Sequence, residues 1–402
     1  MLDINKSKSI SCCCSHYVKK NYYKINLKNL PLTESYSKKF NKNYFKADQV
    51  FNYCDKCKHG FLGNIVDPKT LYNNIYYFRT SKSATSSAGS DFFINFLNSN
   101  LKNKKKISLD IGCNDFYVLN KLKKTNIKIG IDPIQRNFIK KNFFSYNGKY
   151  EDIDLSNFNK RIDLVVCRHT LEHIVDLEFF FKKLNKDTSQ ECEFFFEFPS
   201  LDLLIENYRF DQIFHQHVHY FSLQSIKKCL EKYGFELNNF KYNQHHWGAL
   251  LVNFSKKKKK KTKKTKNLIL IKKKIKQSNK NLNIVEIKSR YNVFVKNMRN
   301  LKDMLEKIEK NKLSFYGASQ MLPVILYHLK FNINLVKSIV DDDKTKKNLT
   351  YNNIDLKIDY LRSHAKISDM SFLVTAPDNA TSITKKLLKL RPKKIFNLVR
   401  GI

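Results

Sequence analysis

Apolar residues in the middle of the chain gather in short runs that are separated by polar segments. Four runs have the length of buried strands: SLDI (108–111), KIGID (128–132), DLVVC (163–167) and EFFFEF (193–198). Helical patterns lie between them, as at 177–184, and residues 223–233 have apolar positions at helical spacing after Ser222, a residue suited to a helix N-cap. Alternating strands and helices predict an α/β fold with a mostly parallel, doubly wound sheet.

A second series of the same kind fills the last quarter of the chain. Its expected strands begin at LSFYGAS (313–319) and SIVDDD (338–343) and continue at SFLVTAP (371–377) and KIFNLV (394–399). A long amphipathic helix is predicted before it, over 284–311, because apolar residues recur there every three or four positions. The expected organisation is a small module at 1–66, a domain at 67–255, a basic linker at 256–283, and a helix plus a second α/β unit at 284–402.

Charge changes this picture little. The formal net charge is +39, which is typical of proteins that bind nucleic acid or anionic surfaces. Lysine is abundant throughout, however, together with Asn, Ile, Phe and Tyr, whose codons are AT-rich, so much of the charge reflects composition. The run KKKKKKTKKTK (256–266) is interpreted as a solvated linker, and nucleic acid is not favoured as a partner. No apolar run approaches the roughly 20 residues of a membrane span, and no signal-peptide core is present, so we expect a cytoplasmic protein without membrane attachment.

The loop after the first strand of the middle domain carries the chemistry of a nucleoside-type cofactor site. LDIGCNDF (109–116) places Asp110, Gly112, Asn114 and Asp115 between a strand and a helix. A glycine there lets the backbone approach a ligand, and an acid after the second strand, Asp132, is placed to accept hydrogen bonds from ribose hydroxyls. The loop is acidic and lacks the GxGxxG pattern, which favours a cationic cofactor, S-adenosylmethionine (SAM), over a dinucleotide. An ordinary strand-to-helix turn is the alternative.

Cysteines near the N-terminus predict a metal site. Cys54 and Cys57 form CDKC, followed by turn residues, which suits two thiolates on one side of a tetrahedral zinc. The other pair is expected near 12–14, where the spacing favours Cys13 with His16. Incidental or redox-active cysteines are the alternative reading.

Several histidines and one tyrosine are candidates for residues that act on the substrate. RHTLEHI (168–174) follows a strand and carries His169 and His173, while FDQIFHQHVHYFS (210–222) carries His215, His217 and His219. If 215–219 is extended, its three alternating imidazoles share one side, and histidine is the natural general base near neutral pH. Residues 67–100 include Tyr77, which is followed by a Ser/Thr/Gly-rich loop, and this segment could cover the site or serve as a plain linker.

The order of these motifs resembles the three-domain sugar C-methyltransferases, a family of class I SAM-dependent methyltransferases. The resemblance implies an N-terminal zinc-binding module, a Rossmann-like methyltransferase domain and a C-terminal Rossmann-like domain, acting on nucleotide-linked keto-deoxysugars. It assigns zinc to Cys54, Cys57 and the region of Cys13 and His16, and SAM to the 110–115 loop and Asp132. Its Tyr-His-Glu-His segment matches 214–217 and makes His217 the general base, with His173, Gln216 or Tyr77 as hydrogen-bond donors to the enolate.

Three residues depart from the family pattern. Phe116 stands where a second glycine is usual, beside the expected methionine pocket, and Phe214 and Gln216 replace the family's tyrosine and glutamate. Three other functions follow from these departures and from the charge: O- or N-methylation of another small molecule, methylation of RNA, or binding without catalysis on a methyltransferase scaffold.

Overall fold

A computed structural model gives the fold of most of the chain. It describes residues 12–13, 22–33, 36–71, 79–101, 103, 105–123, 125–158, 161–245, 248–258, 266–361 and 367–398. Two of the predicted site residues, His16 and Tyr77, lie outside the described residues.

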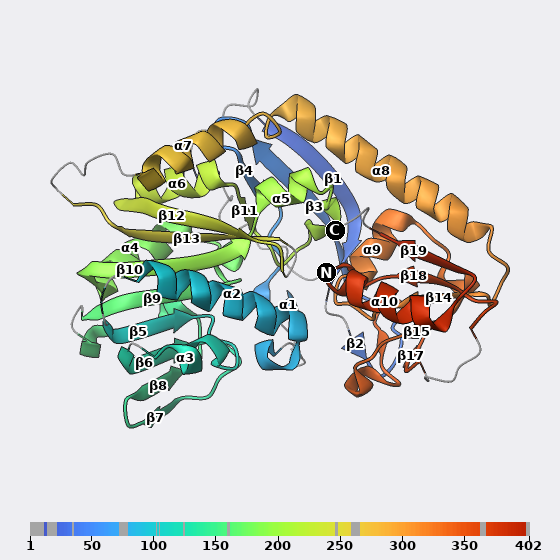
Figure 1. Cartoon of the computed structure of the whole chain (residues 1–402), viewed down its shortest axis with the longest axis horizontal. Coiled ribbons are helices and arrows are strands. Elements are labelled where there is room, and N and C mark those ends of the chain that lie inside the picture. The colour runs from blue at the N-terminus through green and yellow to red at the C-terminus, as the bar shows by residue number, and fades with distance from the viewer. Residues whose placement is uncertain are drawn as a thin grey trace.

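An eight-stranded sheet occupies one side of the molecule, at the left in Figure 1. Its order is β12-β13-β10-β9-β5-β6-β8-β7. The bounds are β5 Lys105–Ile111, β6 Thr125–Ile131, β7 Phe138–Lys140, β8 Phe143–Tyr146, β9 Ile162–Arg168, β10 Thr188–Pro199, β12 Phe235–Asn243 and β13 Ala249–Lys256. Strands β8, β6, β5, β9 and β10 are parallel, whereas β13 runs antiparallel to both β10 and β12. The parallel, doubly wound sheet predicted from the sequence is therefore confirmed.

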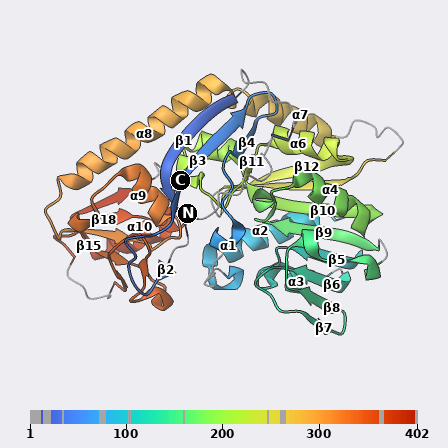
Figure 2. The same ribbon diagram turned by 180° about the vertical axis from the view of Figure 1, so that it is seen from behind.

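Helices cover both faces of this sheet because successive strand residues point to opposite sides. On one face α2 (Ala84–Asn100) and α3 (Tyr117–Lys121) pack against alternate residues of β9, β10 and β13, including Phe195. On the other face α4 (Leu177–Asp187), α6 (Leu223–Lys232) and α7 (Lys266–Ser278) bury Phe194 and Phe196 (Figure 2). Helix α6 begins at the predicted cap, Ser222, which forms a capping box with Ser225. Helix α7 occupies the second half of the stretch predicted as a linker.

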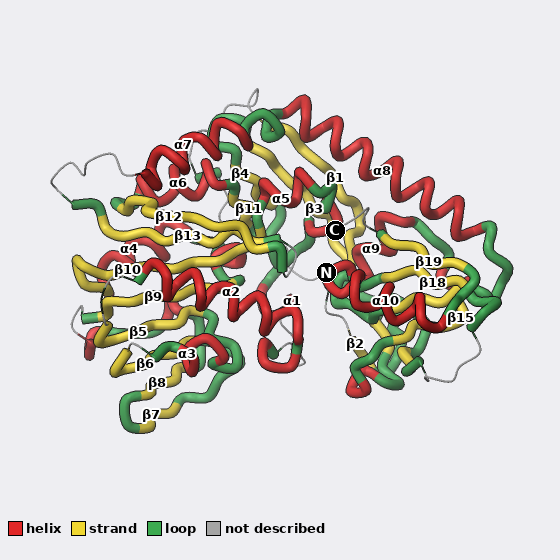
Figure 3. Tube along the Cα trace, viewed as in Figure 1, coloured by secondary structure: helices red, strands yellow, loops and turns green. Residues whose placement is uncertain are grey.

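The C-terminal unit is a second, all-parallel sheet of order β17-β15-β14-β18-β19. Its elements are β14 Leu313–Tyr316, α9 Leu322–Leu329, β15 Val336–Val340, β17 Ile358–Asp359, β18 Ser371–Val374, α10 Ala380–Leu390 and β19 Lys394–Asn397. The predicted amphipathic helix precedes it as α8 (Ile284–Glu306), which runs along the top of the molecule in Figure 3.

The N-terminal segment joins the two units rather than standing apart. Strands β1 (Tyr22–Pro31), β3 (Lys46–Cys54) and β4 (His59–Leu62) form a sheet whose last strand is β11 (His219–Phe221), from the middle domain. One end of this sheet packs with the core of the middle domain, and the other packs with α8 and the C-terminal unit. The short strand β2 (Tyr36–Ser37) also pairs with β16 (Thr350–Tyr351) of that unit. The N-terminal sheet therefore fixes β11, and with it the histidine-rich segment, between the two lobes.

Short helices complete the described chain. They are α1 Pro68–Leu71, α5 Leu201–Glu206, η2 Thr80–Lys82, η3 Tyr150–Asp152, η4 Ser156–Phe158, η5 Leu171–His173, η6 Phe210–Gln212, η7 Ile333–Leu335, η8 Lys344–Lys346 and η9 Pro377–Asn379. No helix in these ranges is both long and apolar enough to cross a membrane.

Candidate functional site

The loop after β5 turns sharply at the carboxyl end of the sheet. Gly112 has a φ of 75°, and a side chain there would meet Thr170 Oγ1 at 1.9 Å, so the loop after β9 lies directly against it. Its N–H donates to the carbonyl oxygen of Ile131, the last residue of β6, at 2.9 Å. A glycine is needed at this position for both its backbone angle and the lack of space.

Asp132 organises the far side of the same loop. Its two carboxylate oxygens accept hydrogen bonds from the backbone N–H groups of Asn114 (2.8 Å) and Ile134 (3.0 Å). Burial raises the pKa of Asp132, and these backbone donors oppose the rise. Each oxygen keeps a second lone pair, so the carboxylate can still accept from a ribose.

Two other loop residues hold the segment in front of them. The side chain of Asn114 accepts from the N–H of Thr80 at 3.2 Å, and Asp115 accepts from the N–H of Ser81 at 2.8 Å. Deeper in the loop, Asp110 is 3% exposed, and burial raises its pKa to about 7. A buried acid of this kind favours the binding of a positively charged group, as the sequence predicts for SAM.

The ring of Phe116 packs against the neighbouring strands of the sheet. Its ring lies over Gly130 of β6, where an added side chain would meet it at 2.7 Å, and it packs edge-on against Phe138 and Phe143. The backbone pays for this placement, because Phe116 has a φ of 61°, a left-handed conformation that costs roughly 1–2 kcal/mol for a residue with a side chain. The expectation that Phe116 stands beside the methionine pocket stays a prediction.

A buried ion pair lies at the ends of β9 and β10. Arg168 Nε donates to Glu197 Oε2 at 2.5 Å, and the second carboxylate oxygen accepts from Asn243 at 2.7 Å. The guanidinium also donates to Ser90 Oγ on α2 at 2.7 Å. Both charges are thus satisfied, and the pair ties the strand ends to the helix above them.

The turn after β9 separates its two histidines. His169, with a φ of 48°, lies 3.6 Å from Glu172 Oε1 and 4.0 Å from Glu197 Oε2, and burial lowers its pKa to about 4. His173, at the end of η5, instead pairs its Nδ1 with the backbone oxygen of Gln216 at 2.7 Å. The two imidazoles do not share one helical face, because η5 is a single tight turn.

The three alternating histidines also go to three different places, which corrects the extended-strand expectation. Residues 213–218 form an irregular turn, and only residues 219–221 belong to a strand. His215 pairs with Gln49 and with the backbone oxygen of Leu30, His219 stacks on His59, and His217 faces His173 with ring centres 5.1 Å apart. His217 also packs on Phe214, at 4.2 Å between ring centres, so the phenylalanine that replaces the family's tyrosine forms one wall beside it.

Buried polar groups without partners gather around His217. One donor atom from each of Glu172, His173 and His217 lies within 4.8 Å of the other two. Glu172 is 1% exposed and Gln216 4% exposed, and neither the carboxylate nor the side-chain amide has a hydrogen-bond partner among the described residues. Such groups are costly to bury unless something fills the site. Glu172 lies within the RHTLEHI segment, but the sequence pattern alone assigns it no role.

The N-terminal thiols form a second buried cluster. Sulfurs of Cys12, Cys54 and Cys57 lie within 4.8 Å of one another, and Cys57, Cys13 and His59 form an overlapping group. Crowding of the thiols and burial raise the pKa values of Cys54 and Cys57 well above the ordinary range. The second pair was expected near 12–14 with Cys13 favoured, and the structure brings both Cys12 and Cys13 to Cys57. The Nδ1 of His59 accepts from the N–H of Cys13 at 3.0 Å.

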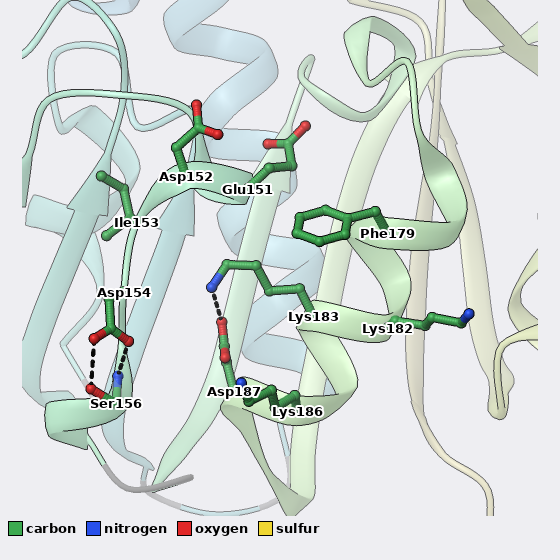
Figure 4. A pocket seen from close by; sticks show the side chains of 10 residues that line it. All are labelled: Glu151, Asp152, Ile153, Asp154, Ser156, Phe179, Lys182, Lys183, Lys186 and Asp187. Carbon is green, nitrogen blue, oxygen red and sulfur yellow. Dashed lines mark hydrogen bonds and ion pairs between the residues drawn. The ribbon is translucent and has the colours of Figure 1, made fainter. Parts of the chain in front are cut away.

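A crevice elsewhere contains none of the predicted site residues. It measures about 500 Å³ and lies between η3, η4 and α4 (Figure 4). Charged side chains of both signs line it, including Glu151, Asp154 and Lys183, and Lys183 is paired with Asp187 at 2.8 Å.

Comparisons with known proteins agree with the fold. Residues 90–239 match the family described as a methyltransferase domain. The match spans α2, the parallel strands and the histidine-rich segment, so this part of the chain is a methyltransferase domain.

Among individual proteins, the C-methyltransferase NovU of Streptomyces niveus is 33% identical over 89 residues, which are 22% of this chain and 21% of NovU. The match thus covers about a fifth of that relative.

Two solved structures are more distant. An S-adenosylmethionine-dependent methyltransferase from Clostridium acetobutylicum is 12% identical, with a TM-score of 0.33, covering 44% of this chain and 94% of the other. The N-methyltransferase NodS of Bradyrhizobium japonicum is 13% identical, with a TM-score of 0.34, covering 44% and 99%. Values this low decide nothing about activity.

Proposed function

We propose that this protein is a SAM-dependent C-methyltransferase of a nucleotide-linked keto-deoxysugar, with His217 as the general base. One observation carries the proposal: buried His217, Glu172 and Gln216 and half-buried His173 form a polar cluster between the turn after β9 and the turn before β11. Ligands of doubly wound sheets bind at the carboxyl ends of the strands. The methyltransferase-domain match and the short match to a C-methyltransferase support the same reading.

The loop at 110–115 and Asp132 would hold the cofactor. SAM, when bound, supplies an electrophilic methyl group on a sulfonium. The buried carboxyl of Asp110 fits the cofactor's positive charge, and Asp132 fits its ribose hydroxyls. Gly112 leaves the backbone open to approach, and Asn114 and Asp115 hold residues 80–81 over the loop.

The acceptor would be activated by the histidine cluster. His217 removes a proton from the carbon beside the keto group, and the electron pair moves toward the keto oxygen. That carbon then bonds the methyl carbon, and the pair of the broken carbon–sulfur bond stays on sulfur. The side-chain amide of Gln216 can donate to the developing oxyanion, as can His173; Tyr77 is a further candidate donor.

The N-terminal thiols would hold a structural zinc. Four cysteines, Cys12, Cys13, Cys54 and Cys57, offer the soft sulfur donors that zinc prefers, and His59 offers a nitrogen. Such a metal would brace β4, and through it β11 and the histidine segment. Metal analysis of the purified chain tests this. We expect about one zinc per chain, and loss of the zinc in Cys57→Ser, which lacks one of the thiolates.

Incubation with labelled SAM and a panel of nucleotide-linked keto-sugars tests the function. We expect His217→Ala to lower transfer by at least about 10²–10⁴-fold while SAM binding by calorimetry is unchanged. His215→Gln is the matched control, because His215 lies in the same segment but bonds Gln49 and Leu30; it should keep transfer per folded molecule.

Normal turnover by His217→Ala contradicts the assignment. Label on an oxygen or nitrogen of the acceptor replaces C-methylation with the alternative chemistry. Label on RNA, or no SAM binding, replaces the proposal with RNA methylation or with a binding protein.

A further inference from the structure

Glu172 is held against the proposed base by backbone bonds on both sides. Its own carbonyl oxygen accepts from the N–H of Val218 at 2.8 Å, and the next residue, His173, pairs with the backbone oxygen of Gln216 at 2.7 Å. These two hydrogen bonds therefore hold the turn η5 against the turn that carries His217. The carboxylate of Glu172 has little freedom to move away from the imidazole of His217.

The carboxylate of Glu172 is buried without a hydrogen-bond partner among the described residues, and His169 Nδ1 lies 3.6 Å from it. Burying such a carboxyl is unfavourable relative to an apolar side chain of similar size, because the carboxyl loses its hydration. Burial raises the pKa of Glu172 to about 7, so the group can change its charge near neutral pH. Retention of such a group beside a candidate base indicates a role in the chemistry.

Charged and titratable groups face Glu172 from every neighbouring element. His169, Arg168 and Cys167 lie on the β9 side, and Glu197 faces it from β10. His173 follows it in η5, while His217 and Tyr220 face it from the segment around β11. Arg168 is already paired with Glu197. The group that gains a positive charge during the proposed reaction is His217.

We propose that Glu172 is a positioning residue for His217: its carboxylate orients the imidazole and stabilises the imidazolium that forms when His217 takes the proton. The inference rests on the proposed function. It also accounts for residue 216, where the family's glutamate is replaced by a glutamine that cannot carry charge. In this chain the acid is supplied by a different element, the turn after β9, and Gln216 is left as a neutral donor.

Three variants test the role. Glu172→Gln keeps the shape but loses the charge, Glu172→Asp restores the charge at a shorter reach, and Glu193→Gln is the control. Glu193 is also a buried acid, but it pairs with Lys105 at the opposite end of the sheet, so its loss reports general destabilisation. All three are measured for kcat, KM for SAM and the pH dependence of kcat.

We expect Glu172→Gln to lower kcat about 100-fold or more, with KM for SAM changed less than about threefold and the acidic limb of the pH profile altered. Glu172→Asp should recover part of the rate, and Glu193→Gln should keep it per folded molecule. Turnover of Glu172→Gln within about threefold of the parent, with an unchanged pH profile, overturns the proposal.

A readout without substrate separates this inference from the proposed function. NMR of histidine-labelled protein follows the titration of the His217 ring directly. The midpoint should move to lower pH by about one unit in Glu172→Gln, because a nearby carboxylate favours the imidazolium. If the His217 midpoint shifts in Glu172→Gln but the parent transfers no methyl group, the coupling between Glu172 and His217 is supported and the proposed enzyme reaction is contradicted. If the parent transfers methyl groups but the midpoint does not shift, the reaction is supported and the coupling is contradicted.

Discussion

The two Rossmann-like units of this chain share a set of backbone hydrogen bonds at the ends of their first two strands, and they differ in which polar side chains remain without hydrogen-bond partners among the described residues. In the first unit Gly112 donates to Ile131, and Asp132 accepts from the backbone of Asn114 and Ile134. The second unit repeats each bond: Gly317 donates to Val340 at 2.8 Å, and Asp341 accepts from Ala318 at 2.7 Å and Asp343 at 2.8 Å. The repeat predicted from the sequence extends to single atoms.

In the second unit the polar groups of the corresponding loops bond to one another. Asp341 also accepts from Lys346 Nζ at 3.1 Å, and the hydroxyl of Thr375 bonds the backbone oxygens of Tyr316 and Gly317. In the first unit the corresponding loop after the neighbouring strand carries Glu172, a buried acid whose carboxylate has no hydrogen-bond partner among the described residues. The same set of backbone hydrogen bonds therefore surrounds a candidate site in the first unit and has a structural role in the second.

The largest expected effect concerns ion pairs. Glu197→Gln leaves Arg168 buried without its countercharge, so we expect a loss of about 3–5 kcal/mol in the free energy of unfolding. Asp342→Asn in the second unit removes a pair with Lys386 whose side chains are 53% and 37% exposed, and it should cost at most about 1 kcal/mol. Urea denaturation measures both. Equal losses would show that burial does not distinguish the two units.

Glycine substitutions are expected to have the next largest effect. In Gly317→Ala the new methyl meets the backbone nitrogen of Ala376 at 2.9 Å and its Cβ at 2.4 Å, and we expect a loss of about 2–4 kcal/mol. In Gly112→Ala the close contact is the hydroxyl of Thr170, which can rotate, so the stability loss should be smaller. SAM affinity, followed by calorimetry, should fall only in Gly112→Ala; a fall in Gly317→Ala would move the cofactor to the second unit.

A smaller effect should appear as a pH dependence of the first unit. Burial raises the pKa of Asp110 to about 7 from an ordinary value near 4. Between these values the folded chain keeps a proton that the unfolded chain releases, so the contribution of Asp110 to stability falls as pH rises toward 7.

Asp110→Asn removes that fall. The difference in unfolding free energy between this variant and the parent should therefore change by about 1–2 kcal/mol from pH 5.5 to pH 7.5, with the parent losing more. A difference that stays constant with pH would show that Asp110 is ionised throughout this range.

Local patterns were enough to predict the frame of both units. The apolar runs predicted the central strands, and Ser222 predicted the start of α6, because strand burial and helix capping depend on neighbouring residues. The loop containing Gly112 and the acid Asp132 could be found for the same reason: strand, turn and acid follow one another directly in the sequence.

Contacts between distant segments could not be predicted in the same way. His215, His217 and His219 look equivalent in the sequence, but they are directed to β1, η5 and β4 by packing with segments more than forty residues away. Cys13 was favoured over Cys12, and Glu172 was given no role, for the same reason: only the fold brings Cys12 to Cys54 and Glu172 to His217. One signal in the sequence could have indicated Glu172: it is an acid next to His173, in a chain where glutamine replaces the family's glutamate at position 216.

The central claim is that the first unit alone binds SAM, and calorimetric titration of SAM tests it most directly. We predict one SAM per chain, an affinity reduced about ten- to a hundredfold in Asp132→Asn, and an affinity within about threefold of the parent in Asp341→Asn. Absence of binding by the parent chain, or loss of binding in Asp341→Asn with Asp132→Asn unaffected, would contradict the account.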